Sequence, residues 1–289
     1  MRLFRIAAIM SLAATCVTGR VQAQSRGGPK VYLGFDANEY PGDGSLAALH
    51  RQFSFTGYWL NNPPGANHNP WVGKREVLRR AGFGFVVVFN GRLDEEILAA
   101  KRTGKAPEAL ARDDASAAVG AARREGFPAG TIIFLDQEEG GRMLPEQAAY
   151  LLGWTEAVAH SVFKPGVYAS GQPVPDEDES GHRITITTIQ DIRAHVAAQH
   201  LHPIAFWAFR DGCPPAPGCV VDPAKLRAPD VSGTLDLAVW QYALSPHGKY
   251  VTRACSATYS RDGNCYLPVM AHFQIDLNSA DSPDPSHGR

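Results

Sequence analysis

The sequence predicts an α/β protein folded as a closed (β/α)8 barrel of the TIM type. Short apolar runs alternate with helical patterns along the 289 residues, and eight such runs can be distinguished. Eight alternating units over this length fit a closed barrel. The run at residues 83–90 is apolar throughout, as expected for a parallel strand buried on both faces. An open doubly wound sheet is the alternative, but no GxGxxG motif follows the first run.

The amino-terminal half contains four strand-like runs separated by helical segments. A helix starts after the first run at Ser45, a residue type that favours helix N-caps. A loop rich in Pro, Gly and Asn follows the second run at 61–70, and Gly82 and Gly126 end the next two helices. We expect strands at 31–38, 55–61, 83–90 and 131–138, and helices at 45–52, 71–81 and 114–125.

The carboxyl-terminal half is less regular. Pro145 stands in the first turn of a helix, and the acidic residues 176–179 are expected to form a solvated insertion after the fifth strand. Helical patterns weaken around strands six to eight, so the barrel is expected to be irregular there. We expect helices at 145–161 and 187–200, and strands at 166–170, 203–210, 235–243 and 273–278.

The amino terminus has the three-part layout of a secretory signal peptide. Arg2 and Arg5 precede an apolar run at 6–18 that is too short to span a bilayer, and Val21-Gln22-Ala23 offers a cleavage site. A buried helix is the alternative interpretation. The predicted organisation is a Sec-type signal peptide (1–23), a linker (24–30), the barrel (31–279) and a disordered tail (280–289), in a secreted or periplasmic protein.

The charge balance indicates no polyanionic partner. The formal net charge is −1, and it becomes −4 when Arg2, Arg5 and Arg20 leave with the signal peptide. Such a chain has no general attraction to nucleic acid or to an anionic membrane. We expect no nucleic-acid partner, no membrane span and a monomer, although the sequence leaves the oligomeric state open.

The cysteine count supports export. Of the five cysteines, Cys16 lies in the predicted signal peptide, and an even number remains, which predicts two disulfides. Short loops favour the pairs Cys213–Cys219 and Cys255–Cys265 among the three possible pairings. No CxxC or HExxH motif is present, so neither a metal nor a cofactor is predicted.

Carboxylates follow three of the predicted strands. Asp36 ends the first, Asp136 and Glu138 end the fourth, and Asp276 ends the eighth. In a barrel of this type, the ends of the strands line the active site. Asp136 and Glu138 share a face at about 7 Å because side chains alternate along a strand. Two such carboxylates can divide the work of glycoside hydrolysis, in which one donates a proton and the other stabilises positive charge.

Aromatic side chains supply a second indication. Sugar rings stack their C–H faces on aromatic rings, and Tyr and Trp also donate hydrogen bonds. Packing in the barrel core is the alternative role for each residue. Trp240 and Tyr242 share a face near a strand end and are the better candidates for contact with substrate. The full set of candidate aromatic residues is Tyr58, Trp59, Tyr168, Trp207, Trp240 and Tyr242.

The chain resembles the glycoside hydrolase family 25 lysozymes in five short motifs, which cover residues 30–280. It is more closely similar to the bacterial glycoside hydrolase-like domain (formerly DUF1906) related to them. The motifs are Gly34-Phe35-Asp36, Asp136-Gln137-Glu138, Gly166-Val167-Tyr168, Trp240-Gln241-Tyr242 and Asp276-Leu277-Asn278. The segment that continues from Asp36, the 61–70 loop and the Cys-Pro-Pro segment after strand six depart from the family pattern.

The resemblance implies a β/α barrel, often irregular, with N-acetylmuramidase-type chemistry on peptidoglycan. By position, Glu138 looks like the general acid. Asp136 looks like the partner that orients the 2-acetamido group of the substrate or a water. Asp36 and Asp276 look like supporting carboxylates that bind substrate, and Asn278 belongs to the same motif as a substrate-binding candidate.

Three functional hypotheses follow. The first is an exported glycoside hydrolase acting on peptidoglycan or a related N-acetylated glycan. The second is a non-catalytic barrel that binds cell-wall glycan. The third is a chitinase-like hydrolase, which is less favoured because residues 132–135 lack the carboxylates of the full DxxDxDxE motif.

Overall fold

The computed structural model describes residues 30–178, 180–210, 227–244 and 275–289. The predicted signal peptide lies outside these residues, as do the disulfide candidates Cys213, Cys219, Cys255 and Cys265. Among the described helices, none is both long and apolar enough to cross a membrane.

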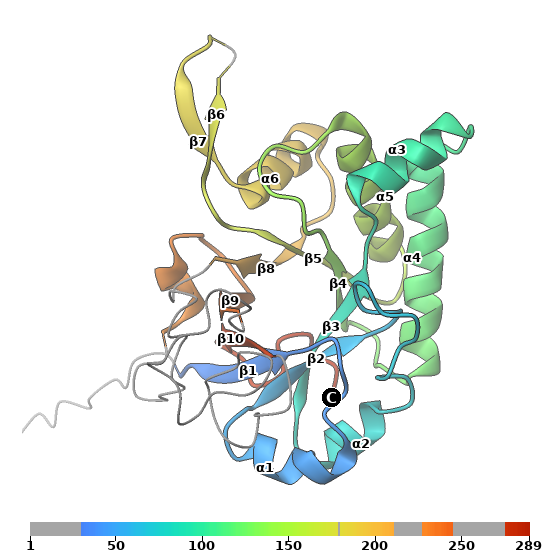
Figure 1. Ribbon diagram of the computed structural model, residues 1–289, viewed down its shortest axis with the longest axis vertical. Helices are drawn as coiled ribbons and strands as arrows, with labels where there is room; N and C mark the ends of the chain where they lie inside the picture. Colours follow the sequence, from blue (N-terminus) through green and yellow to red (C-terminus); the bar gives the residue numbers. More distant parts are fainter. Residues whose placement is uncertain (1–29, 179, 211–226, 245–274) are drawn as a thin grey trace, which may run out of the picture.

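Eight strands close into a barrel in the order β1-β10-β9-β8-β5-β4-β3-β2, which confirms the predicted fold class (Figure 1). The first five in the chain are separated mainly by helices, and β8, β9 and β10 complete the ring. Their bounds are β1 Tyr32–Asp36, β2 Phe55–Trp59, β3 Gly84–Asn90, β4 Ile132–Asp136, β5 Lys164–Ser170, β8 Ala205–Phe209, β9 Val239–Ala243 and β10 Asp276–Ala280.

The last strand runs against the expected direction. β10 pairs antiparallel with both of its neighbours, β1 and β9, whereas every other neighbouring pair in the barrel is parallel. β10 therefore starts at the rim where β9 ends, and Asp276 is its first residue instead of lying near its end. This irregularity falls within the region where the sequence predicted one.

The helices lie on the outside of the barrel, and α4 and α5 pack against each other beside β4 and β5 (Figure 1). A Cβ on Gly153 of α5 would lie 3.1 Å from the Cβ of Ala111 in α4, so the small residues at this point allow the close approach. The helices are α1 Leu46–His50, α2 Arg75–Arg80, α3 Asp94–Arg102, α4 Pro107–Arg124, α5 Pro145–Ala159 and α6 Thr188–Gln199, with short 3₁₀ turns η1 Asp43–Ser45 and η3 Pro229–Ser232.

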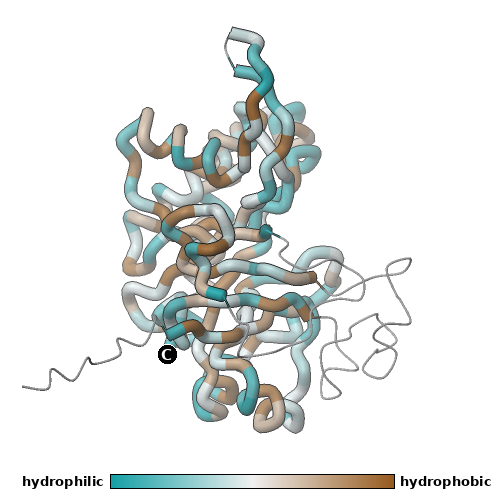
Figure 2. The backbone as a smooth tube through the Cα atoms, turned by 90° about the vertical axis from the view of Figure 1, so that its left-hand side faces the viewer, coloured by the Kyte–Doolittle hydropathy of each residue, from teal (hydrophilic) through white to brown (hydrophobic). Residues whose placement is uncertain are grey.

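One helix and a two-stranded hairpin were not predicted. Helix α3 begins with Asp94 and two glutamates in its first turn, where acidic side chains favour a helix start. Strands β6 (Val174–Glu177) and β7 (Arg183–Ile186) form an antiparallel hairpin within the segment expected to be a solvated insertion. The hairpin is largely exposed and stands away from the barrel in both views (Figures 1 and 2).

The carboxyl-terminal residues are ordered, so the prediction of a disordered tail at 280–289 was wrong. They fill the space between the starts of β3 and β4, whose pairing begins only at Val87 and Ile133. Ser286 is fully buried there: its Oγ accepts a hydrogen bond from the Val87 amide at 2.8 Å, and its carbonyl accepts one from Ile132 at 2.8 Å. These bonds satisfy backbone groups that strand pairing leaves open.

We expect Ser286→Ala to destabilise the protein by about 1–3 kcal/mol, because it leaves the buried amide of Val87 without an acceptor. Chemical denaturation monitored by circular dichroism measures this change. Ser116→Ala, on the exposed face of α4, is the matched control and should leave the free energy of unfolding unchanged. Equal stability of the two variants would show that the tail does not support the barrel.

Candidate active site

Three of the predicted carboxylates meet at one rim of the barrel. Asp36 and Asp136 are the last residues of β1 and β4. Asp276 is the first residue of β10 and lies directly opposite Asp36 in the antiparallel pair. The reversed direction of β10 therefore leaves Asp276 at the rim that the sequence predicted.

Two side-chain amides hold Asp36 inside the barrel. Asn278 Nδ2 donates to Asp36 Oδ1 at 2.5 Å, and Gln241 Nε2 donates to the same oxygen at 3.0 Å. A Cβ on Gly57 of the neighbouring strand would lie only 2.7 Å from the Cβ of Asp36, so the glycine provides the space for this carboxylate.

Two aromatic residues fix the direction of these amides. Trp207 Nε1 donates to Asn278 Oδ1 at 2.8 Å, and the Tyr168 hydroxyl donates to Gln241 Oε1 at 2.7 Å. An indole N–H can only donate, so it must face the amide oxygen of Asn278 and leaves the amide N–H groups directed at Asp36. Tyr168 and Trp207 also pack edge to face, with ring centroids 4.7 Å apart.

Burial changes the acidity of two of the carboxylates. Burial raises the pKa of Asp36 to about 6, against the lowering effect of the hydrogen bonds from Asn278 and Gln241. Burial and the charges of Glu138, Asp36 and Glu139 raise the pKa of Asp136 well above its usual value. Asp136 is 6% exposed, and its buried Oδ1 has no hydrogen-bond partner among the residues that the structure describes. The two carboxylates therefore tend to retain protons.

The hydroxyl of Tyr168 is affected by all four predicted catalytic carboxylates. Burial raises the pKa of its hydroxyl well above the usual value, and the charges of all four predicted catalytic carboxylates act in the same direction. All four carboxylates therefore lie near enough to the half-buried Tyr168 to act on its hydroxyl.

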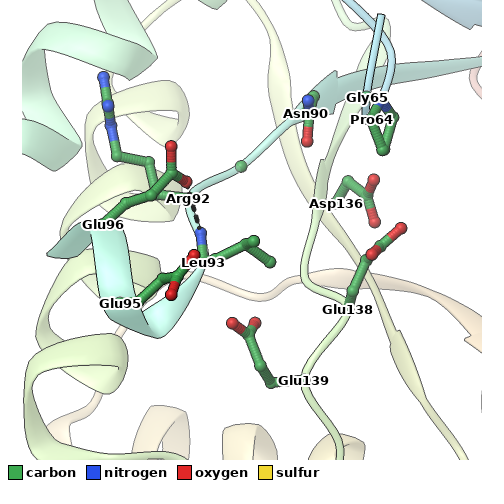
Figure 3. Close-up of a pocket in the computed structure, with 11 residues that line it drawn as sticks. Pro64, Gly65, Asn90, Arg92, Leu93, Glu95, Glu96, Asp136, Glu138 and Glu139 are labelled. Atoms are coloured by element: carbon green, nitrogen blue, oxygen red, sulfur yellow. Dashed lines mark hydrogen bonds between the residues drawn. The ribbon is translucent and has the colours of Figure 1, made fainter.

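Glu138 faces a cavity beside the rim. Figure 3 shows the carboxylates of Asp136 and Glu138 pointing toward each other on one wall. The cavity has a volume of about 260 Å³ and adjoins a second of about 340 Å³, with which it shares Asn90 and Arg92. Partial burial and the charge of Glu139 raise the pKa of Glu138. An accessible carboxyl that holds its proton at higher pH than usual suits a general acid.

The 61–70 loop forms part of the wall of this cavity. Pro64 and Gly65 line it beside Asp136, and Leu93, Glu95 and Glu96 lie across from Asp136 and Glu138 (Figure 3). No aromatic side chain is among the described residues that line it.

Glu139 was not predicted as a site residue, yet it anchors the segment that carries Glu138. It accepts hydrogen bonds from the Asp94 amide at the start of α3 at 2.7 Å, from Gln137 at 2.7 Å and from Gln147 at 3.1 Å. The sequence contained a signal for it, since the acidic run continues past Glu138 and Asp94 begins a helix whose first amides need acceptors.

The structure separates two of the predicted aromatic residues on β2. Trp59 is buried near Asp36 and donates to the Ala37 carbonyl at 3.0 Å. Tyr58 points the other way: it is fully buried against Phe85 and Phe127, and its hydroxyl donates to Glu125 at the end of α4. Tyr58 is therefore a packing residue outside the barrel interior and not a substrate contact.

The predicted face of strand β9 was wrong. Trp240 and Tyr242 do not point into the barrel, because the inward residue between them is Gln241, which bonds to Asp36 and Tyr168. Trp240 instead donates to the Arg210 carbonyl at 2.7 Å. The pair stacks at 5.6 Å between centroids on the outer side, so neither residue is placed to contact a sugar at the carboxylates.

We expect Gln241→Leu to raise the pKa of Asp36 above about 6, because it removes a hydrogen bond that stabilises the ionised form. An NMR titration of the Asp36 carboxyl carbon measures the change. Gln172→Leu, in the loop after β5 and outside this network, is the control and should leave the titration unmoved. An unchanged pKa in Gln241→Leu would contradict the role assigned to this amide.

The chain was compared with a family model, with curated proteins and with solved structures. The model of the Rv2525c-like, glycoside hydrolase-like domain matches residues 55–215. A comparison with curated proteins gave no match. Among solved structures, an uncharacterized protein of B. stearothermophilus shares the fold, with a TM-score of 0.51, 17% identity, and coverage of 86% of this chain and 95% of that one.

Two further solved structures are similar at lower TM-scores. The Tat-secreted protein Rv2525c of Mycobacterium tuberculosis has a TM-score of 0.49 and 12% identity, covering 88% of this chain and 96% of that one. A bacterial lysozyme from Streptomyces coelicolor has a TM-score of 0.43 and 14% identity, with coverage of 87% and 92%. The family model spans more than half of the sequence, and the chain therefore belongs to the Rv2525c-like, glycoside hydrolase-like domain family.

Proposed function

We propose that the protein is an exported glycoside hydrolase that cleaves peptidoglycan or a related N-acetylated glycan. The observation that carries this proposal is the position of four carboxylates at one rim of the barrel. Asp36 and Asp136 end β1 and β4, Asp276 lies opposite Asp36, and Glu138 lines the cavity beside Asp136. The predicted signal peptide supports export, and membership of a glycoside hydrolase-like family supports the substrate class.

Glu138 is the proposed general acid. Its carboxyl faces the cavity, and its pKa is raised by partial burial and by the charge of Glu139. It would donate its proton to the leaving glycosidic oxygen as the C–O bond breaks and positive charge develops on the sugar ring. The anchoring of Glu139 to α3 and to Gln137 and Gln147 holds the segment that positions Glu138.

Asp136 is the proposed partner of Glu138. The Asp136 side chain lines the cavity beside Glu138, so its carboxyl is placed to accept a hydrogen bond from a substrate acetamido N–H or from a water. A cationic transition state beside it would favour its ionised form, which burial and the neighbouring carboxylates otherwise disfavour. Asp136 then stabilises the transition state more strongly than the ground state, which is the condition for catalysis.

Asp36 and Asp276 support this pair. Asn278 and Gln241 orient Asp36, and Gln241 Nε2 also lies 3.5 Å from Asp276 Oδ2. In this arrangement the two carboxylates bind substrate hydroxyl or amide groups at the floor of the site and add negative charge near Asp136.

The direct test is digestion of insoluble peptidoglycan by the purified protein, followed by measurement of new reducing ends and mass spectrometry of the soluble fragments. We expect release of muropeptides with new reducing ends. Saturable binding to peptidoglycan without new reducing ends would replace the hydrolase with the non-catalytic glycan-binding barrel. Cleavage of chitin oligosaccharides but not of peptidoglycan would favour the chitinase-like alternative.

A further inference from the structure

A cluster of metal-ligand side chains lies at the opposite end of the barrel from the carboxylates. Glu156 and His160 are four residues apart at the end of α5, which starts near the catalytic rim and runs back along the outside of the barrel. Side chains at this spacing share one face of a helix. His202 lies in the segment between α6 and β8.

Strand pairing brings these two segments together. β5 begins a few residues after α5 ends, and it pairs in parallel with β8, with Gly166 opposite Ala205. The end of α5 and the start of β8 therefore lie at the same end of the barrel. One ligand atom from each of the three side chains lies within 4.8 Å of the others.

Hydrogen bonds fix the rings in a form that can bind a metal. His160 Nδ1 lies 2.7 Å from the Glu156 carbonyl oxygen. A carbonyl oxygen only accepts, so Nδ1 carries the hydrogen and the lone pair of the neutral ring is on Nε2. A backbone carbonyl bonded to the second ring nitrogen is the usual partner of a metal-bound histidine.

His202 contacts the carboxylate directly. Its Nδ1 lies 2.8 Å from Glu156 Oε2, and its backbone amide donates to Glu156 Oε1 at 2.8 Å. A metal ion would replace the hydrogen between Nδ1 and Oε2, and the backbone amide would keep its bond to Oε1. The rings of His160 and His202 are 5.1 Å apart between centroids and inclined at 76°. The two histidines are exposed and Glu156 is half-buried, so the histidine rings can turn without disturbing the core.

We propose that Glu156, His160 and His202 form a zinc-binding site that joins the end of α5 to the start of β8. Two imidazoles and one carboxylate suit Zn²⁺, whereas Ca²⁺ and Mg²⁺ prefer oxygen ligands throughout. Ligand atoms on a tetrahedral zinc lie about 3.4 Å apart at zinc–ligand distances of 2.0–2.1 Å, so small rotations of the exposed side chains close the site.

The site stabilises the fold instead of taking part in glycan cleavage. Its ligands come from two segments that are 42 residues apart, from His160 to His202, and a metal bound only by the folded chain shifts the unfolding equilibrium toward the folded state. The inference does not depend on the proposed hydrolase activity, because metal binding and thermal stability are measured without a glycan.

The test is calorimetric titration of the full-length protein with ZnCl₂, together with a thermal melt at each concentration. We expect low-micromolar binding by the wild type and a rise in Tm with zinc, and no such response to MgCl₂. His160→Ala and His202→Ala should each weaken the binding by about tenfold or more and remove the zinc-dependent rise in Tm. Both histidines are exposed, so both variants are expected to fold.

The matched control is His195→Ala, an exposed-face histidine of α6 outside the cluster, which should bind zinc as the wild type does. Zinc bound elsewhere on the chain contributes equally to the wild type and the variants, so the difference in zinc affinity between them measures binding at this site. Equal zinc affinity in the wild type, His160→Ala and His202→Ala would overturn the proposal, as would the absence of binding below millimolar zinc.

Discussion

Replacing Glu138 with Gln should lower the rate of peptidoglycan cleavage by about 10²–10⁴-fold, the contribution that a positioned general acid makes. Gln has the same shape and still donates a hydrogen bond, but it cannot transfer a proton to the leaving oxygen. Glu138 is exposed to the cavity and makes no hydrogen bond within the described residues, so the exchange should leave folding intact. Initial rates of reducing-end release, with circular dichroism as the folding check, measure the effect.

The control for Glu138→Gln lies in the same cavity. Glu95 also lines this cavity and is exposed, but it belongs to α3 and lies on the wall across from Glu138 (Figure 3). Glu95→Gln removes the same charge from the same space and should retain most of the activity. A similar loss in both variants would assign the effect to the charge of the cavity and not to a proton donor.

The pH profile gives a second test of the same assignment. A general acid works only while protonated, so activity should fall on the alkaline side as the pH passes the raised pKa of Glu138. The residual activity of Glu138→Gln should not show this decrease at alkaline pH. A wild-type profile that is flat through this range would contradict proton donation by Glu138.

The positions of the carboxylates could be predicted because they depend on local sequence. Asp36 and Asp136 follow short apolar strands, and in a barrel the last residue of each parallel strand lies at the rim. Alternation along the strand then places Phe134 and Asp136 on the inner face, and Phe134 packs against Trp207 inside the barrel. No long-range information was needed beyond the fold class.

The face of β9 could not be predicted from its pattern. Val239, Trp240, Gln241 and Ala243 are all buried, so the strand has no exposed face and its hydrophobicity does not alternate. A shift in register between Leu277 and Asn278 of β10 adds to the difficulty, because it brings Asn278 opposite Gln241. One step of register exchanges the two faces of a strand, so the pattern of β9 alone did not show that Gln241 points inward and holds Asp36.

The prediction that the carboxyl-terminal tail is disordered was wrong for a different reason. Its composition of Asp, Ser and Pro is typical of disordered segments, and composition describes only what a segment can bury by itself. Here the partner is distant in sequence: the starts of β3 and β4 leave backbone groups open, and Asp284 and Ser286 supply the acceptors. The polar residues that suggested disorder are the ones that make these bonds.

Replacing Asp136 with Asn should abolish cleavage and, at neutral pH, stabilise the protein by about 0.5–2 kcal/mol, the range of common stabilising substitutions. The carboxylate is buried, its Oδ1 has no hydrogen-bond partner within the described part of the chain, and the charges of Glu138, Asp36 and Glu139 oppose its ionisation. A neutral amide of the same shape removes that repulsion, and its N–H groups can donate to the carboxylates around it. Denaturant unfolding at a series of pH values measures the gain.

The sign of the pH dependence distinguishes this explanation from a general packing effect. A carboxyl whose pKa is raised in the folded state stabilises that state at low pH and loses the contribution as the pH rises through the folded pKa. For Asp36 alone, a rise from 3.8 to about 6 corresponds to about 2 kcal/mol lost between pH 4 and 7. The wild type should therefore be more stable at pH 4.5 than at pH 7. Asp136→Asn should flatten this slope, so its advantage should be small at low pH and largest at neutral pH.

Asp113→Asn provides the contrast, because the bond to Lys105 lowers the pKa of that exposed carboxyl and its removal should give no stabilisation at any pH. If Asp136→Asn is no more stable than the wild type at pH 7, Asp136 is not held under electrostatic strain. If it is more stable but still cleaves peptidoglycan, the strain is real and serves no catalytic purpose. Greater stability combined with lost activity is the result that ties the raised pKa of Asp136 to its proposed role, since the protein then keeps a destabilising charge only where the reaction needs it.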